Sequence, residues 1–400
     1  MTRTLFHGGT IVDPVLGRTE SDLVIEDDRI VEIGSSLDGD EAVDCTDKYL
    51  FPGLFDCHVH LAYSHINLWR HIHTPLSYNF YLAIGNMAKT VAVGITTVRD
   101  AGGADLGMKE AVDDGLINGP RMQISLAMMS QTGGHADGWN PSGTPVVLGP
   151  PYPGRPDGLA DGPDEVRKKV RELVRAGADV IKVATSGGVL SPRDEPTHAH
   201  YSPEELDVLV AEAAAAGIWV MAHAQAAPGI KNALRAGIRS IDHGIYLDDE
   251  AIGLMLERGA YLVPTLLAPT GVEKAVEDGV QIAEASIRKA REVVEVHKES
   301  FRKAVDAGVN IAMGTDSAVT PHGSNLGELS LMVANGQTPD QAFASGTIKA
   351  ATLMGLEKDL GSLEVGKLAD LVISATDPLE FDELKAGIEQ VWKAGARIVG

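Results

Sequence analysis

The sequence predicts an α/β protein, with a (β/α)8 TIM barrel and a small β-sandwich built from both chain termini. Six times in the middle of the chain, a helical pattern ends at a glycine and a short apolar, β-prone segment follows. Repetition of helix, glycine and strand is typical of parallel strands connected by helices. Histidine, lysine and aspartate residues stand at the ends of several of these segments. Active sites of such barrels are assembled from the C-terminal ends of the strands.

The glycines lie where the backbone turns left-handed after a helix, a position that favours glycine. They are Gly94, Gly177, Gly217, Gly237, Gly259 and Gly308. The strands predicted after them are 95–100, 179–184, 218–223, 239–243, 261–265 and 309–316. Two further predicted strands, 54–60 and 122–127, complete the eight of the barrel.

Three other segments have clear local signals. Ser202 and Thr338 each begin a capping box, with proline at the first helical position. The charge-rich pattern over 272–307 predicts two helices before the last strand. The segment 131–163 is rich in glycine and proline, so we expect an irregular loop over the active site.

The two chain ends differ from the middle. Segments 4–44, 368–374 and 391–399 have short alternating patterns that are typical of β-strands. Neither end alone can bury a β face, so we expect the two ends to pair. The sequence therefore predicts one composite β-sandwich domain from 1–52 and 362–400, and a (β/α)8 barrel over 53–361.

Composition excludes several classes of protein. The formal net charge of −22 argues against a surface that binds nucleic acid, which needs clustered lysine and arginine. Two cysteines cannot form a disulfide framework, and no apolar signal-peptide segment follows Met1. The apolar stretch 208–227 is interrupted by charged and polar residues, so it does not predict a membrane span. We expect a cytoplasmic homo-oligomer that acts on a small molecule.

His58 and His60 are two residues apart on a predicted strand, so both side chains point to the same face. Imidazoles in this arrangement can bind one metal ion.

Lys182 lies between Val180, Ile181, Val183 and Ala184, and a buried lysine is rare and costly unless it is paired. One interpretation is that CO2 carboxylates its amine, giving a carbamate that bridges two metal ions. The alternative, a lysine that reaches solvent from the strand end, stays open.

His223 and His243 end two successive predicted strands, and Asp316 ends the last one. Two histidines at equivalent strand ends indicate metal ligands. An aspartate at a strand end is also common as a helix N-cap, so Asp316 alone does not indicate a metal site.

His58-x-His60, Lys182, His223, His243 and Asp316, in this order, resemble the ligand set of the amidohydrolase superfamily. The segments 130–137 and 182–188 are similar to the branch of Xaa-Pro dipeptidases, arginine carboxypeptidase-like enzymes and ochratoxin-type amidases. The resemblance implies two divalent ions, expected to be zinc. His58, His60 and Asp316 would hold one ion, His223 and His243 the other, and carboxylated Lys182 would bridge them.

The same resemblance implies roles for three residues. Asp316 would be the general acid/base for a metal-bridging hydroxide. His135 would hold or polarise the scissile carbonyl, and Tyr201 would bind a substrate carboxylate. No role is assigned to His65, His71, His73, His198 or His200.

The predicted function is hydrolysis of an amide or peptide bond in a dipeptide or an N-acyl amino acid. The alternative is a hydrolase of a xenobiotic urea, carbamate or aryl amide, because sequence does not identify the substrate. A single-metal deaminase on the same scaffold is disfavoured, because Ala224, Gln225 and Ala226 follow His223 and Lys182 is present. A non-catalytic assembly protein is disfavoured because all six ligand positions are intact.

Overall fold

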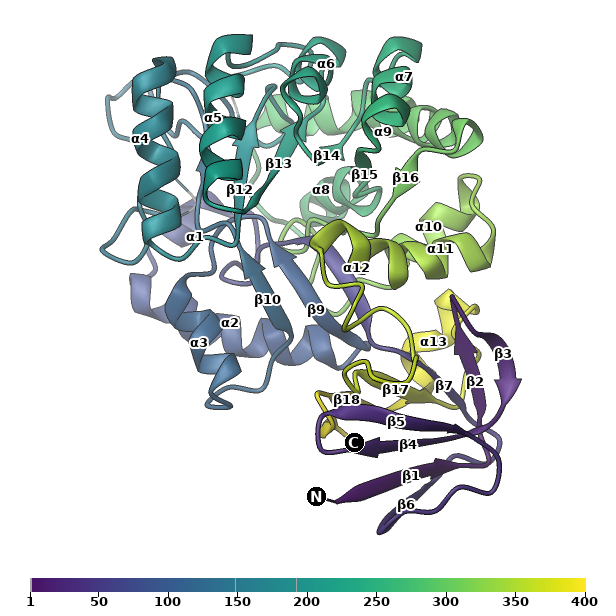
Figure 1. Cartoon of the computed structure of the whole chain (residues 1–400). Helices are drawn as coiled ribbons and strands as arrows, with labels where there is room; N and C mark the ends of the chain where they lie inside the picture. The colour runs from purple at the N-terminus through teal and green to yellow at the C-terminus, as the bar shows by residue number, and fades with distance from the viewer. Residues whose placement is uncertain (1, 148, 192) are drawn as a thin grey trace.

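The structure is a computed structural model that describes residues 2–147, 149–191 and 193–400. Parallel strands surrounded by helices form the larger part, and a layer of strands from both termini packs beside it (Figure 1). The predicted α/β class is therefore confirmed. Within the described residues, no helix has both the length and the hydrophobicity needed to cross a membrane.

The parallel strands form two sheets, in the orders β10-β9-β8 and β11-β12-β13-β14-β15-β16. Their bounds are β8 (Leu54–Val59), β9 (Ile95–Asp100), β10 (Arg121–Ile124), β11 (Met128–Met129), β12 (Val180–Ala184), β13 (Trp219–Ala224), β14 (Ser240–His243), β15 (Tyr261–Val263) and β16 (Asn310–Ile311). Backbone hydrogen bonds also connect the sheets, from Cys57 N to Met313 O and from Asp179 N to Ile124 O. The strand ends that carry the candidate ligands therefore lie together.

The prediction of a strand over 309–316 is mostly wrong, because only β16 (Asn310–Ile311) forms within that range. The chain continues beside β8, and Asp316 N donates to His58 O at 2.8 Å. Asp316 has a positive φ of 58°, which ends the extended geometry. Gly314 allows this close approach, since a Cβ there would lie 3.0 Å from the Cβ of His58.

Helices cover the parallel strands and pack apolar faces on them. They are α1 (Leu68–Ile72), α2 (Leu76–Val91), α3 (Leu106–Asp113), α4 (Gly162–Arg175), α5 (Pro203–Ala215), α6 (Ala227–Ala236), α7 (Asp249–Arg258), α8 (Leu267–Glu277), α9 (Glu284–Ala307), α10 (Gly327–Ala334), α11 (Pro339–Ser345) and α12 (Ile348–Met354). Both predicted capping boxes are present, at α5 and α11. The two helices predicted over 272–307 are α8 and α9. The irregular loop predicted over 131–163 has no helix or named strand among its described residues before α4 begins at Gly162.

The terminal strands form two sheets, in the orders β5-β4-β1-β6 and β19-β18-β17-β7-β2-β3. Their bounds are β1 (Arg3–His7), β2 (Thr10–Asp13), β3 (Gly17–Glu20), β4 (Asp22–Glu26), β5 (Arg29–Gly34), β6 (Glu41–Asp44), β7 (Tyr49–Pro52), β17 (Leu371–Ser374), β18 (Ile388–Lys393) and β19 (Ala396–Val399), with α13 (Phe381–Gly387) beside them. Phe6 and Leu23 share a buried cluster with Leu371 and Ile373. The N-terminal and C-terminal strands thus bury one core together (Figure 1).

An ion pair connects the terminal strands to the parallel strands. Arg121 on β10 donates to Asp370 at 2.7 Å, and the Asp370 side chain is only 3% exposed. Asp370 also accepts a hydrogen bond from Ala394 N at 2.8 Å.

Asp370→Ala should lower the free energy of unfolding by about 3 kcal/mol, because it leaves Arg121 without its buried partner. Urea unfolding followed by circular dichroism measures the change. Asp359→Ala is the matched control, since Asp359 pairs with Arg29 at 3.0 Å but is half exposed. The control should change stability by less than about 1 kcal/mol. Equal effects of the two substitutions would contradict the structural role of Asp370.

Candidate active site

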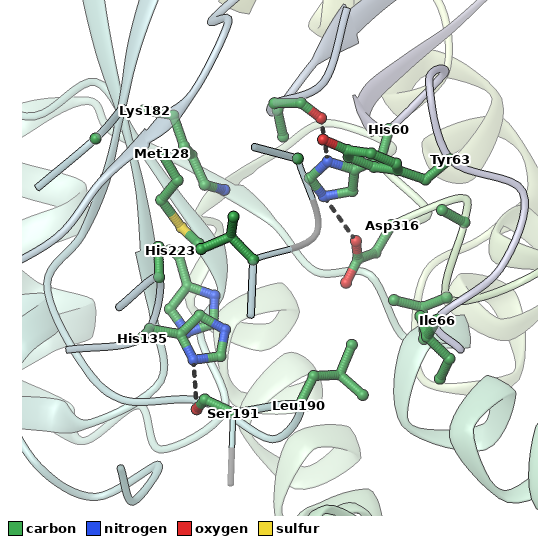
Figure 2. Close-up of a pocket in the computed structure, with 18 of the residues that line it drawn as sticks. His60, Tyr63, Ile66, Met128, His135, Lys182, Leu190, Ser191, His223 and Asp316 are labelled. Atoms are coloured by element: carbon green, nitrogen blue, oxygen red, sulfur yellow. Dashed lines mark hydrogen bonds and ion pairs between the residues drawn. The ribbon is translucent and has the colours of Figure 1, made fainter. Parts of the chain in front are cut away.

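A cavity lies at the C-terminal ends of the parallel strands. Its wall includes all six expected metal ligands and His135. In Figure 2, Lys182, His223 and His135 lie on one side, and His60 and Asp316 lie on the other. The structure therefore brings together residues that are up to 258 positions apart, from His58 to Asp316.

His58, His60 and Asp316 form the tightest cluster, with ligand atoms within 4.8 Å of one another. Asp316 Oδ1 lies 3.6 Å from His58 Nε2 and 3.3 Å from His60 Nε2. Burial opposes ionisation of Asp316, but the imidazoles of His58 and His60 hold its pKa well below the usual range. Asp316 is thus an ionised carboxylate beside two imidazole nitrogens.

Hydrogen bonds on the outer ring nitrogens orient these two histidines. His58 Nδ1 donates to Asp242 Oδ2 at 2.8 Å, and His60 Nδ1 donates to Gly102 O at 2.7 Å. Each bond leaves Nε2 free to face Asp316. Burial and the charge of Lys182 lower the pKa of His58 to about 4, so its Nε2 keeps a lone pair at neutral pH. Metal-binding histidines are oriented in this way.

His223 and His243 adjoin this cluster through their rings. The ring centroids of His58 and His243 are 5.0 Å apart, and those of His223 and His243 are 4.6 Å apart. His223 Nε2 donates to Gly187 O at 3.2 Å, and His243 Nδ1 hydrogen-bonds Thr265 Oγ1 at 2.7 Å. The opposite nitrogen of each ring is left for a ligand. Burial holds the pKa of both imidazoles well below the usual value, so both are neutral.

Lys182 on β12 is 1% exposed, which excludes the interpretation that it reaches solvent from the strand end. Its Nζ lies 3.3 Å from Asp242 Oδ2. Asp242 also accepts hydrogen bonds from Arg99 Nη2 at 3.2 Å and from Ser240 Oγ at 3.0 Å. Burial lowers the pKa of Lys182, although Asp242 opposes the shift.

His135 belongs to a second buried network. Its ring stacks on His223 with centroids 4.1 Å apart, and a Cβ at Gly188 would collide with it. His135 Nδ1 lies 2.9 Å from Ser191 Oγ and 3.1 Å from Asp194 Oδ2. An ionised carboxylate can only accept, so the proton is on Nδ1 and Nε2 lies on the opposite side of the ring.

Lys289 on α9 holds the loop that carries Asp194. Its Nζ, which is fully buried, donates to the carbonyls of Gly188, Ser191 and Asp194 at 2.7, 2.6 and 2.8 Å. Burial opposes ionisation of Asp194, but its bond to His135 and the charge of Lys289 lower its pKa. The lack of a side chain at Gly188 leaves room for the His135 ring, because a Cβ there would collide with it.

Tyr201 is placed differently from the other expected site residues, because it is not part of the cavity wall. Its hydroxyl is buried without a hydrogen-bond partner among the described residues. Burial raises the pKa of Tyr201, and the negative charges of Glu205 and Asp161 add to the effect. An anion would be repelled there.

Sequence reasoning missed several residues that reach the site from loops and from α9. Asp194 and Lys289 orient His135, and Gln225 and Arg155 line the cavity. The Oε1 atom of Gln225 is buried without a hydrogen-bond partner among the described residues. No spacing rule connects these residues to the ligands.

The donor set fits divalent cations. His58, His223 and His243 are neutral and Asp316 is an ionised carboxylate, which are the forms in which such ligands bind zinc. Burial opposes protonation of His60, but Asp316 raises its pKa, so His60 would release its proton when it binds metal. Lys182 fits only after carboxylation, because an ammonium group has no lone pair.

A sequence model of the amidohydrolase family matches residues 49–398. The chain belongs to the amidohydrolase family. It is 36% identical to an ochratoxinase of Aspergillus niger over 410 residues, covering 94% of this chain and 82% of the relative.

Two solved structures extend the comparison. A Xaa-Pro dipeptidase with bound methionine in its active site is 35% identical, with a TM-score of 0.90 over 100% of both chains. The A. niger ochratoxinase structure is 31% identical, with a TM-score of 0.87 over 100% of this chain and 96% of that one. This amidohydrolase is therefore an enzyme that hydrolyses C–N bonds, which confirms the predicted family and enzyme class.

The network around His135 predicts a single tautomer. Long-range proton–nitrogen correlation spectra of histidine-labelled protein should show the proton on Nδ1 of His135, with His135→Asn identifying the signal. Asp194→Ala should give a mixture of tautomers, because the Ser191 hydroxyl can donate or accept. Glu195→Gln is the control, since Glu195 pairs outward with Arg288 at 3.0 Å. A pure Nδ1 tautomer in Asp194→Ala would contradict the role of Asp194.

Proposed function

We propose that this amidohydrolase is a binuclear metal-dependent enzyme that cleaves an amide or peptide bond in a dipeptide or an N-acyl amino acid. The observation that carries the proposal is the gathering of His58, His60, Lys182, His223, His243 and Asp316 at one cavity. The hydrogen bonds on their outer atoms support the assignment, because ligands need such support.

His58, His60 and Asp316 would hold one ion, and His223 and His243 the other. Lys182, carboxylated by CO2, would contribute to both. When bound, two zinc-type ions lower the pKa of water and polarise the scissile carbonyl. Carbamate formation needs a neutral amine, and the burial of Lys182 favours that form.

Asp316 would move the proton between the attacking water and the leaving amine. Its carboxylate is suited to this because it is ionised and lies within the cluster of predicted metal ligands. When both of its ring nitrogens carry a proton, His135 would donate through Nε2 to the substrate carbonyl oxygen, while Asp194 accepts from Nδ1 and acts through His135 as a positioning residue. Fixed donors stabilise charge that develops on this oxygen without reorganisation.

The names of the relatives favour the dipeptide or N-acyl amino acid class, since the most similar solved structures include a Xaa-Pro dipeptidase. The cavity wall has apolar side chains that would suit a hydrophobic acyl group, including Ile66, Val146, Leu190 and Val319. A urea, carbamate or aryl amide is the second candidate, because these walls would also accept an aromatic ring. Tyr201 lies outside the cavity wall, so we no longer propose it as the carboxylate ligand.

We further propose that the parallel strands close into a (β/α)8 barrel over 53–361, and that 1–52 with 362–400 form the composite sandwich domain. Backbone hydrogen bonds between the two parallel sheets support closure. The cytoplasmic location and the homo-oligomer expected from the sequence stay predictions.

Metal-loaded protein should release free amino acid from a panel of dipeptides and N-acyl amino acids. A chelator should abolish this activity, and added Zn²⁺ should restore it. The panel also includes phenylureas, aryl carbamates and adenosine as alternative substrates. Cleavage of the ureas or carbamates alone would favour the second candidate. Ammonia release from adenosine alone would contradict hydrolysis of an acyl–nitrogen bond.

Asp316→Asn should lower kcat by about three orders of magnitude with little change in KM, because a proton acceptor is lost. The variant must first be shown to retain both metal ions by elemental analysis. Asp248→Asn is the control, since Asp248 caps α7 through Ala251 N at 2.8 Å and asparagine caps equally well. Near-normal kcat in metal-replete Asp316→Asn would refute the proton-transfer role.

A further inference from the structure

Arg155 is a buried cation in the wall of the catalytic cavity. It lies on the loop between β11 and α4, and only 9% of it is exposed. Its Nε donates to Leu126 O at 2.8 Å, and its Nη1 donates to Gly149 O. These two bonds fix the plane of the guanidinium and leave other N–H groups available, since arginine has five.

Arg155 differs from the other buried cations of the described chain in having no carboxylate partner. The other five each have one within 4.0 Å: Arg99 with Asp242, Lys169 with Asp157, Lys182 with Asp242, Lys289 with Asp194 and Lys367 with Glu364. Backbone carbonyls bind a guanidinium but do not neutralise it. A buried charge without an opposite charge is costly, so the fold leaves a position that an anion would stabilise.

Tyr63 lies close to Arg155 and also to the cluster of predicted metal ligands. A Cβ added at Gly149 would collide with both the Tyr63 hydroxyl and the Arg155 guanidinium, so both groups contact the same point of the loop. The Tyr63 ring centroid is 6.3 Å from that of His60. A tyrosine hydroxyl can donate a hydrogen bond. Two donors, one of them charged, thus lie near the predicted metal ligands.

We propose that Arg155, with the Tyr63 hydroxyl beside it, binds the carboxylate of the substrate. This inference rests on the proposed amide hydrolysis and narrows its substrate class to anionic molecules, such as dipeptides and N-acyl amino acids. A planar guanidinium matches a carboxylate in shape and charge. A neutral urea or carbamate would leave the positive charge of Arg155 without an opposite charge. The anion site then lies on the Tyr63 side of the cavity, and not at Tyr201.

Kinetics with a matched pair of substrates tests the proposal. The pair is the N-acyl amino acid that the wild-type enzyme cleaves best and its C-terminal carboxamide. Arg155→Gln keeps a donor but removes the charge, and should raise KM for the acid at least about tenfold while kcat changes little. KM for the carboxamide should stay within about threefold. Arg155→Lys restores the charge and should recover most of the preference for the acid.

Arg193→Gln is the control variant, because Arg193 is an exposed arginine that stacks over Trp139 at 5.3 Å. It should leave the preference for the acid unchanged. If Arg155→Gln weakens acid and carboxamide equally, or changes neither, the proposal is overturned. Melting temperatures of all variants exclude a general loss of structure as the cause.

Calorimetric titration with phenylacetate and with 2-phenylethanol separates this inference from the proposed function, because neither probe has an amide bond. The metal-loaded wild-type enzyme should bind phenylacetate at least about tenfold more tightly than Arg155→Gln does. The two proteins should bind 2-phenylethanol alike. This result would support the anion site even if the substrate panel showed no amide hydrolysis. Equal phenylacetate affinity of the two proteins would overturn the anion site even if amides were cleaved.

Discussion

The buried carboxylate of Asp242 is the interaction on which the rest of the site depends. It accepts from His58, Lys182 and Arg99 while its side chain is fully buried. Burial alone would favour its neutral form, but the charges of Lys182 and Arg99 and the bond to His58 hold its pKa far below the usual range. One ionised group on β14 thus orients residues from β8, β9 and β12. Without it, Arg99 would lose its buried partner, and His58 would lose the bond that aims Nε2 at Asp316.

A second buried charge organises the opposite wall of the cavity in the same way. Lys289 ties three carbonyls of one loop together, and Asp194 from that loop sets the orientation of His135. The two networks meet where the rings of His135 and His223 stack. The strands and the residues that follow them therefore supply the predicted metal ligands, whereas loops supply the groups that would contact the substrate, and Lys289 on α9 holds one of these loops. This division is common in enzymes whose loops vary on a fixed scaffold.

Most of the metal ligands could be predicted from the sequence because they lie in, or directly after, strands whose register follows from local patterns, whereas Asp316 lies five residues beyond β16. His58 and His60 share a face by the two-residue period, and Lys182 stands out as a charge inside an apolar strand. Asp194, Lys289 and Arg155 could not be predicted, since their roles depend on contacts between segments with no common period. Tyr201 was expected at the substrate, but it has a positive φ of 59° and its hydroxyl lies outside the cavity. The strand before Asp316 was overpredicted because apolar content does not reveal that Met313 bonds Ser345 O and Cys57 N instead of continuing the ladder with β15.

The central claim is that Lys182 becomes a negatively charged ligand between two metal ions. Lys182 is 1% exposed and lies in the wall of the same cavity as the other predicted metal ligands. The most direct measurement is carbon NMR of protein loaded with Zn²⁺ in the presence of ¹³C-bicarbonate, combined with elemental analysis. The account predicts one carbamate signal and two metal ions per chain, both lost in Lys182→Ala. Two bound ions without a carbamate signal in the wild-type protein would contradict it.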